Sequence, residues 1–269
     1  MKIMYIGSHP LNDEQKNSLL AEGSCELEER INSVRLGTVE EQKDFISELK
    51  NEKVGCLVCS LPPEIMTNIR KEFSGEILLP SAERIIDENG NKAFSTNGFE
   101  RITEFSFECH SADYHDEDDA KEVVSVSRHE PTSEQVYALP VESSIRTMNL
   151  TIPNSIEEEN GRDILTILKT FDTVSLVCSP KQYWLVEALK DKNVEVIIPR
   201  GKFENGSFKF DHYDVVDKAV YKYEKMSFDE TKDFLENKEN SDTEKEYSSK
   251  NENNFERNDN YFDDVESSR

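Results

Sequence analysis

An internal repeat constrains the fold of this chain more than any other feature of its sequence. Residues 3–15 align with residues 123–135, and the His, Glu and Gln of the two segments coincide. Three further blocks follow in the same order and at nearly the same spacing: 54–60 with 174–179, 76–80 with 195–199, and 105–108 with 221–224. Four blocks in one order indicate a tandem duplication. The sequence therefore predicts two domains of roughly 110 residues each, a usual domain size.

Each half has the pattern of a small α/β domain. Apolar runs at 54–59 and 174–178 are typical of a central strand covered on both faces. We also expect strands at 2–7, 32–36, 76–79, 101–108, 146–150, 195–198 and 217–224, helices at 40–51, 64–73, 163–169 and 181–190, and Asn-Gly hairpin turns at 89–90 and 205–206. The alternation predicts two tandem Rossmann-like domains, each a mainly parallel sheet with an antiparallel edge hairpin.

The charge distribution divides the chain further. We assign the first repeat to 1–108, an acidic linker to 109–121, the second repeat to 122–225 and an acidic tail to 226–269. The tail holds 14 acidic and 6 basic residues and few apolar ones. Such a composition buries too little apolar surface to offset chain entropy. We therefore expect a short helix at 227–238 and disorder beyond it.

Composition excludes several classes of function. With 56 Asp and Glu against 32 Lys and Arg, the net charge is −24, which argues against binding of long nucleic acid. The sequence contains no apolar segment long enough for a transmembrane helix and no signal-peptide pattern, so we expect a cytoplasmic protein without membrane contact. Five cysteines give no disulfide framework, and no dinucleotide, Walker or nucleophile-elbow motif occurs. We expect no cofactor and no metal site.

Polar residues follow the strands that the pattern places at the centre of each half. Ligands of parallel sheets bind outside the carboxyl ends of the strands, and helix N-termini favour anions there. Gly7 would permit close approach of a ligand, Arg128 could hold a phosphate through two hydrogen bonds, and a histidine could transfer a proton. The candidate ligand-binding residues are Gly7, Ser8, Asn12, Ser60, Ser127, Arg128, Thr132, Ser179 and Lys181, and the candidate catalytic residues are His129 and His9.

Each candidate also has a structural interpretation. Asn12 and Thr132 begin capping boxes, with a glutamine three residues later in each, and Ser60 and Ser179 can cap the following helices. A histidine after a strand can anchor its loop. Arg200, which follows Pro199 at the end of a strand, occurs in the second half only.

The pattern Ser-(Arg)-His-x-(Leu/Pro)-(Thr/Asn)-x-Glu-Gln, present at 7–15 and 127–135, resembles the opening of small CRISPR-associated Rossmann-like proteins. These are relatives of CARF domains and include standalone ring nucleases. The resemblance implies a homodimer that holds a cyclic oligoadenylate across its two-fold axis, and some members cleave it without metal through a ribose 2′-OH. For this chain it implies an intramolecular pseudo-dimer, with further oligomerisation left open.

We therefore expect the chain to bind a cyclic oligoadenylate or a related small anionic nucleotide, with or without metal-independent cleavage, at the interface of the two repeats. Gly7-Ser8 stands where the second half has Ser127-Arg128, so one half-site is cationic and the other nearly neutral. This difference favours one-sided cleavage or binding without turnover. The alternative is a non-catalytic interaction protein whose acidic surface and tail hold a basic partner. A nucleotide-modifying enzyme on the same fold is a third class.

Overall fold

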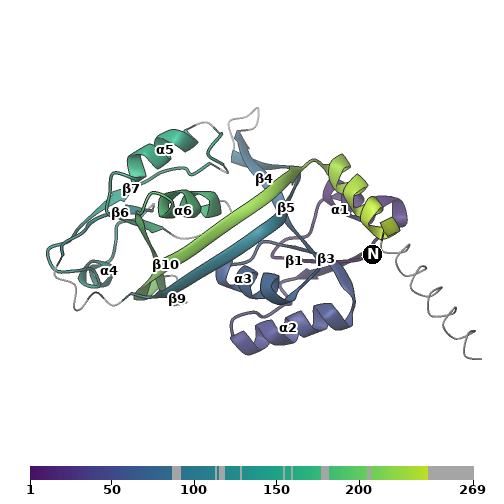
Figure 1. Cartoon of the computed structure of the whole chain (residues 1–269), viewed down its shortest axis with the longest axis horizontal. Coiled ribbons are helices and arrows are strands. Elements are labelled where there is room, and N and C mark those ends of the chain that lie inside the picture. The colour runs from purple at the N-terminus through teal and green to yellow at the C-terminus, as the bar shows by residue number, and fades with distance from the viewer. Residues whose placement is uncertain are drawn as a thin grey trace, which may run out of the picture.

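The chain forms one mixed ten-stranded sheet with helices on both faces (Figure 1). The computed structural model describes residues 1–86, 92–112, 114, 119–127, 129–153, 155–158, 160–176, 182–204 and 207–241. The strands are β1 (Lys2–Gly7), β2 (Glu26–Ile31), β3 (Val54–Cys59), β4 (Glu76–Ile86), β5 (Lys92–Ser111), β6 (Glu122–Val126), β7 (Ser144–Met148), β8 (Thr173–Leu176), β9 (Glu195–Glu204) and β10 (Ser207–Met226). The helices are α1 (Asp13–Leu20), the 3₁₀ turn η1 (Ala21–Gly23), α2 (Val39–Asn51), α3 (Pro63–Glu72), α4 (Ser133–Tyr137), α5 (Gly161–Leu168), α6 (Tyr183–Lys190) and a last helix at 228–241.

The two halves repeat the same order of elements along the chain, and the strand order of the second half across the sheet is the reverse of that of the first. The strand order is β2-β1-β3-β4-β5-β10-β9-β8-β6-β7, so the halves meet where β5 pairs with β10. Within each half the first four strands are parallel, and the last strand is antiparallel to its neighbour. Because β5 and β10 are antiparallel, the parallel strands of the two halves run in opposite directions.

The prediction of a separate sheet in each half, with its hairpin at an edge, is wrong. The hairpins β4–β5 and β9–β10 lie at the centre of the single sheet. The physical reason is length: β5 and β10 each run for 20 residues, and pairing them satisfies backbone groups that an edge strand would leave open. β5 also continues to Ser111, so the first residues of the predicted linker belong to the sheet.

Two apolar layers cover the sheet, and the larger one is shared by both halves. Helices α2, α3, α5 and α6 bury side chains in one continuous core on one face. At its centre Phe105 and Tyr221 are paired across β5 and β10, and Tyr183 of α6 packs on both rings with centroid separations of 5.0 and 5.2 Å. The Tyr183 hydroxyl also donates to the carbonyl oxygen of Leu61 at 3.0 Å. Tyr183 thereby joins the second half to the loop that follows β3.

Most of the remaining elements lie where the sequence predicts them. β1 and β3 match the predicted ranges, α2 and α3 differ by one residue, and both capping boxes are formed. The predicted strand at 32–36 is wrong, because the second strand is β2, an edge strand whose charged side chains give no apolar run. Val34 and Leu36 instead pack into the core from a loop. The Asn-Gly turns at 89–90 and 205–206 lie outside the described residues.

The last helix, 228–241, is docked on the first half beside α1 (Figure 1). Leu235 is fully buried there, and the Arg101 guanidinium lies 4.5 Å from the Phe234 ring. Glu76 pairs with Arg101 and with Lys238 of the helix. Burial alone would raise the pKa of Glu76, but these hydrogen bonds outweigh it and lower the pKa. This part of the predicted tail is thus a packed element, while residues 242–269 lie outside the described part of the chain.

We predict that Leu235→Ala lowers the free energy of unfolding by about 2–5 kcal/mol, because it leaves a cavity between the helix and the sheet. Leu20→Ala is the matched control, since Leu20 is 37% exposed, and it should cost about 1 kcal/mol or less. Urea unfolding of both variants measures the difference. Equal losses would contradict the docking of helix 228–241.

Candidate functional site

The loop after β1 holds the first group of candidate residues. Ile6 pairs with Cys59 of β3, so Gly7 and Ser8 begin beside Ser60 at one edge of the sheet. The Tyr5 hydroxyl donates to the His9 carbonyl oxygen at 2.7 Å, and a Cβ at Gly7 would lie 2.0 Å from that hydroxyl. Glycine at position 7 therefore makes room for the Tyr5 ring. In this half the ring fills space that the sequence suggested for a ligand.

The Asn12 side chain is held by hydrogen bonds, whereas the Ser60 side chain is exposed. Asn12 accepts from the Gln15 backbone at 2.8 Å and donates to the Thr96 hydroxyl at 2.8 Å. Ser60 is exposed, and the interpretation of Ser60 as a helix cap is wrong because α3 begins after Pro62 without a side-chain cap. A residue before proline disfavours the helical conformation, which delays the start of α3.

The loop after β6 holds the second group. Val126 pairs with Leu176 of β8, so β6 and β8 end side by side just before Ser127. The Ser127 hydroxyl accepts from the His129 backbone at 3.1 Å, and Thr132 caps α4 by accepting from the Gln135 backbone. Arg128, Ser179 and Lys181 lie outside the described residues.

The two groups do not meet. Six strands separate β1 from β6, which corresponds to roughly 34 Å along the sheet at about 4.8 Å per strand. Figure 1 shows β1 and β6 on opposite sides of the β5–β10 pair. The structure therefore brings candidate residues together within each half, but the described members of the two groups do not form one pocket.

The two candidate catalytic histidines lack orienting partners. His9 and His129 are both exposed, and among the described residues neither imidazole makes a hydrogen bond. A general acid or base needs a position fixed relative to the reacting atom. This arrangement favours contact with a ligand over proton transfer.

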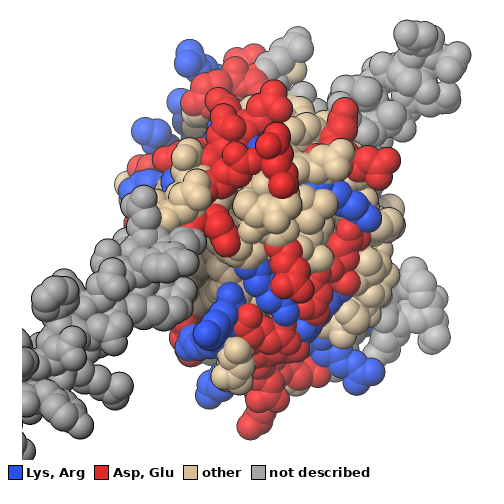
Figure 2. All heavy atoms as spheres, turned by 90° about the vertical axis from the view of Figure 1, so that its right-hand side faces the viewer, with Lys and Arg blue, Asp and Glu red and all other residues tan. Residues whose placement is uncertain are grey.

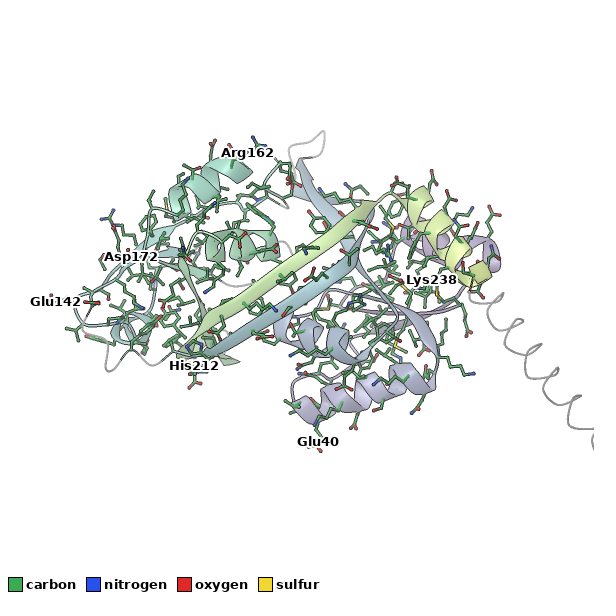
Figure 3. The ribbon with its side chains drawn as sticks, in the orientation of Figure 1. Glu40, Glu142, Arg162, Asp172, His212 and Lys238 are labelled. Carbon is green, nitrogen blue, oxygen red and sulfur yellow. The ribbon has the colours of Figure 1, made fainter. Side chains whose placement is uncertain are left out.

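A cluster that joins the two halves is centred on Arg200 of β9. Its guanidinium donates to Asp214 of β10 at 2.6 Å and pairs with Glu64 of α3. His212 Nε2 lies 3.1 Å from the other oxygen of Asp214, and Figure 3 shows His212 at the lower-left end of the diagonal β5–β10 pair. The sequence pattern placed Arg200 after a strand, but β9 continues through it to Glu204. Its partner Glu64 lies 136 residues away and belongs to no motif.

The cysteine of this cluster, Cys109, has a thiol of low reactivity. Cys109 Sγ lies 3.6 Å from Asp214 and 3.7 Å from Arg200. Burial, together with the charges of Asp214 and Glu64, raises the pKa of the Cys109 thiol to about 11, because these effects outweigh Arg200. The thiol is therefore protonated at neutral pH and is a poor nucleophile.

The described residues also contain no group of three or more His, Cys, Asp or Glu placed to hold a metal ion. Cys56 and Cys59 are fully buried in β3, and burial raises the pKa of Cys59 to about 12. In the described part of the chain, no helix is long and apolar enough to cross a membrane.

Comparison with protein-family models and with curated protein sequences found no match for this chain. The class of protein therefore has to be argued from its topology and from the residues at its strand ends.

We predict that Arg200→Met lowers the free energy of unfolding by about 2 kcal/mol, because it leaves Asp214 and Glu64 partly buried without their cation. Lys222→Met is the matched control: its pair with Glu104 is more than half exposed, so its loss should change stability far less than the loss of Arg200 does. Urea unfolding measures both. Adding Asp214→Asn to Arg200→Met should recover part of the loss, and a further full loss would contradict the electrostatic explanation.

Proposed function

We propose that the chain is a tandem pair of Rossmann-like domains that binds one small anionic nucleotide at the strand ends of its second half. The observation that carries the proposal is the position of the switch points. In each half the strand order reverses between the first and third strands, between β1 and β3 and between β6 and β8. Ligands of open parallel sheets bind at such switch points. Gly7, Ser8 and Ser60 follow one of them, and Ser127 follows the other.

Differences between the halves favour the second one. Position 125 carries serine where the first half has Tyr5, so the ring that fills the first switch point has no counterpart there. Arg128 belongs to the segment after β6, and Lys181 to the segment after β8. In the first half, the segment between β1 and α1 and the segment between β3 and α3 contain no Lys or Arg. Among these segments, only those of the second half offer basic side chains to an anion.

A cyclic oligoadenylate is the first ligand to test, given the resemblance of 127–135 to small CRISPR-associated proteins. The separation of the two strand-end groups argues for one ligand per chain rather than one shared across the halves. The exposure of His129 without an orienting partner among the described residues favours binding without turnover.

A second candidate function, binding of a basic partner, has support from surface charge. Figure 2 shows that Asp and Glu cover more of the face around the N-terminus than Lys and Arg do. Removal of 242–269 tests whether the acidic tail takes part in binding, because the remaining chain keeps helix 228–241 and its contacts with the first half. Binding through the acidic tail would be lost, and binding at a strand-end pocket would remain.

We predict that one cyclic oligoadenylate raises the melting temperature of the full chain and binds with a stoichiometry of one per chain. A ligand at 100 times its dissociation constant adds about 2.7 kcal/mol of stability, which a thermal-shift assay detects. Calorimetric titration with cyclic tri-, tetra- and hexa-adenylate measures stoichiometry, and chromatography of the mixtures detects any cleavage.

Arg128→Ala combined with Lys181→Ala should abolish this shift. The matched control is Ser8→Ala combined with His9→Ala in the first half, which should leave the shift unchanged. Equal loss in both variants would contradict the assignment to the second half. The absence of a shift with every nucleotide would favour the basic-partner candidate.

A further inference from the structure

An exposed apolar patch lies on the second half, between α4 and the edge strand β7. Tyr137 is 85% exposed, Val141 81% and Val136 40%. They lie close together in the sequence, on a helix of five residues and the turn that follows it. Exposed apolar side chains that gather on one surface mark an interaction site more often than isolated ones do. We call these three residues the α4 patch.

Helix 228–241 lies beside the equivalent part of the first half, where Ala21 is buried and Asn17 is exposed. Residues 16, 17 and 21 occupy the positions of the α4 patch there and are Lys, Asn and Ala. Lys232 of the helix pairs with Glu22, and a cleft of about 470 Å³ between α1 and the helix is lined by Asn17, Ser18 and Phe228, among others. The first half thus shows how an amphipathic helix sits against this part of the fold.

The second half keeps the carboxylate of that contact, and within the described part of the chain no helix lies against it. Glu22 corresponds to Glu142, and both adopt left-handed backbone conformations, with φ of 52° and 68°. Among the described residues, no cation pairs with Glu142, and Figure 3 shows it at the left-hand extremity of the molecule. Leu19 and Leu139 are the buried counterparts beneath the two surfaces.

We propose that the α4 patch docks an amphipathic helix of a partner protein that has an apolar ridge and basic flanks. The apolar ridge would cover Tyr137 and Val141, and a Lys or Arg would pair with Glu142 as Lys232 pairs with Glu22. Charge selects the partner, because Glu130, Glu134 and Glu142 are exposed around the patch. The apolar residues of this surface differ from the residues proposed above for the nucleotide site, although Glu130 and Glu134 lie next to that site in the sequence.

The same charge argument disfavours the protein's own C-terminal segment as the occupant. Residues 242–269 carry nine acidic and four basic side chains, so they would meet the carboxylates around α4 with like charge. A second copy would bring helix 228–241, whose charged side chains are mostly acidic and whose apolar face is already buried on its own first half.

The test uses a fluorescent peptide of residues 227–241 with Asp229→Lys, Asp233→Lys and Asn237→Lys, three exposed positions on one side of the helix. These changes make the peptide net basic and leave its apolar ridge intact. Fluorescence anisotropy with the full chain should show saturable binding. The unmodified, acidic 227–241 peptide is the charge control and should bind at least about tenfold more weakly.

Variants of the full chain locate the contact. Tyr137→Ser combined with Val141→Ser should weaken binding of the basic peptide by about tenfold or more, as expected when central apolar anchors are removed. Glu142→Gln should weaken it by about two- to fivefold. Val39→Ser is the matched control, because Val39 is 63% exposed on the first half and should not affect binding.

Three results would overturn the proposal. They are no saturable binding of the basic peptide, equal binding to the chain with Tyr137→Ser and Val141→Ser, or equally tight binding of the acidic peptide. The last result would indicate a second copy of the chain as the occupant. The nucleotide titrations use different variants, so failure of one proposal leaves the other intact.

Discussion

The antiparallel pairing of β5 with β10 determines the rest of this structure. It joins two halves of the same topology into one sheet and removes the open edge that each final strand would otherwise present. It also reverses the direction of the second half relative to the first. The carboxyl ends of β1 and β6 therefore lie at opposite edges of the sheet with six strands between them. The described members of the two strand-end groups are therefore held apart by this connection.

As a result of the same pairing, the segment that follows each long strand packs on the other half. Because β5 and β10 cross the centre of the sheet, the segment after β5 packs on the second half, where Tyr114 joins the buried cluster. The helix after β10 packs on the first half, where Leu235 is buried. Equivalent carboxylates receive the two segments: Glu195 accepts from Tyr114 and pairs with Lys121, whereas Glu76 pairs with Lys238 and Arg101. Each half thus depends on chain that follows the long strand of the other.

Local sequence predicted the features that local forces determine. The apolar run of β3 and the capping boxes at Asn12 and Thr132 depend on neighbouring residues, and the structure has both. β2 could not be found in this way, because an edge strand with charged side chains lacks an apolar pattern. The contact of Tyr183 with Leu61 and the pairing of β5 with β10 join residues more than 100 positions apart. No local pattern encodes such pairings.

The candidate site shows the same division. The alternation of strands and helices was sufficient to place polar residues at the strand ends, where the switch points lie. It could not show that the Tyr5 ring lies against Gly7, because a glycine after a strand suits a close ligand and a close ring equally well. Nor could it show that the Asn12 amide is held by Thr96, which is 84 residues away.

Both proposals concern the second half, and packing of the first half explains why. Tyr5 fills the first switch point and is held by the His9 carbonyl, while helix 228–241 covers the flank of α1. The same positions in the second half carry Ser125 and the exposed α4 patch. Both halves rest on the shared core that contains Tyr183. Surfaces that the first half uses for its own packing can therefore stay open in the second half without loss of that core.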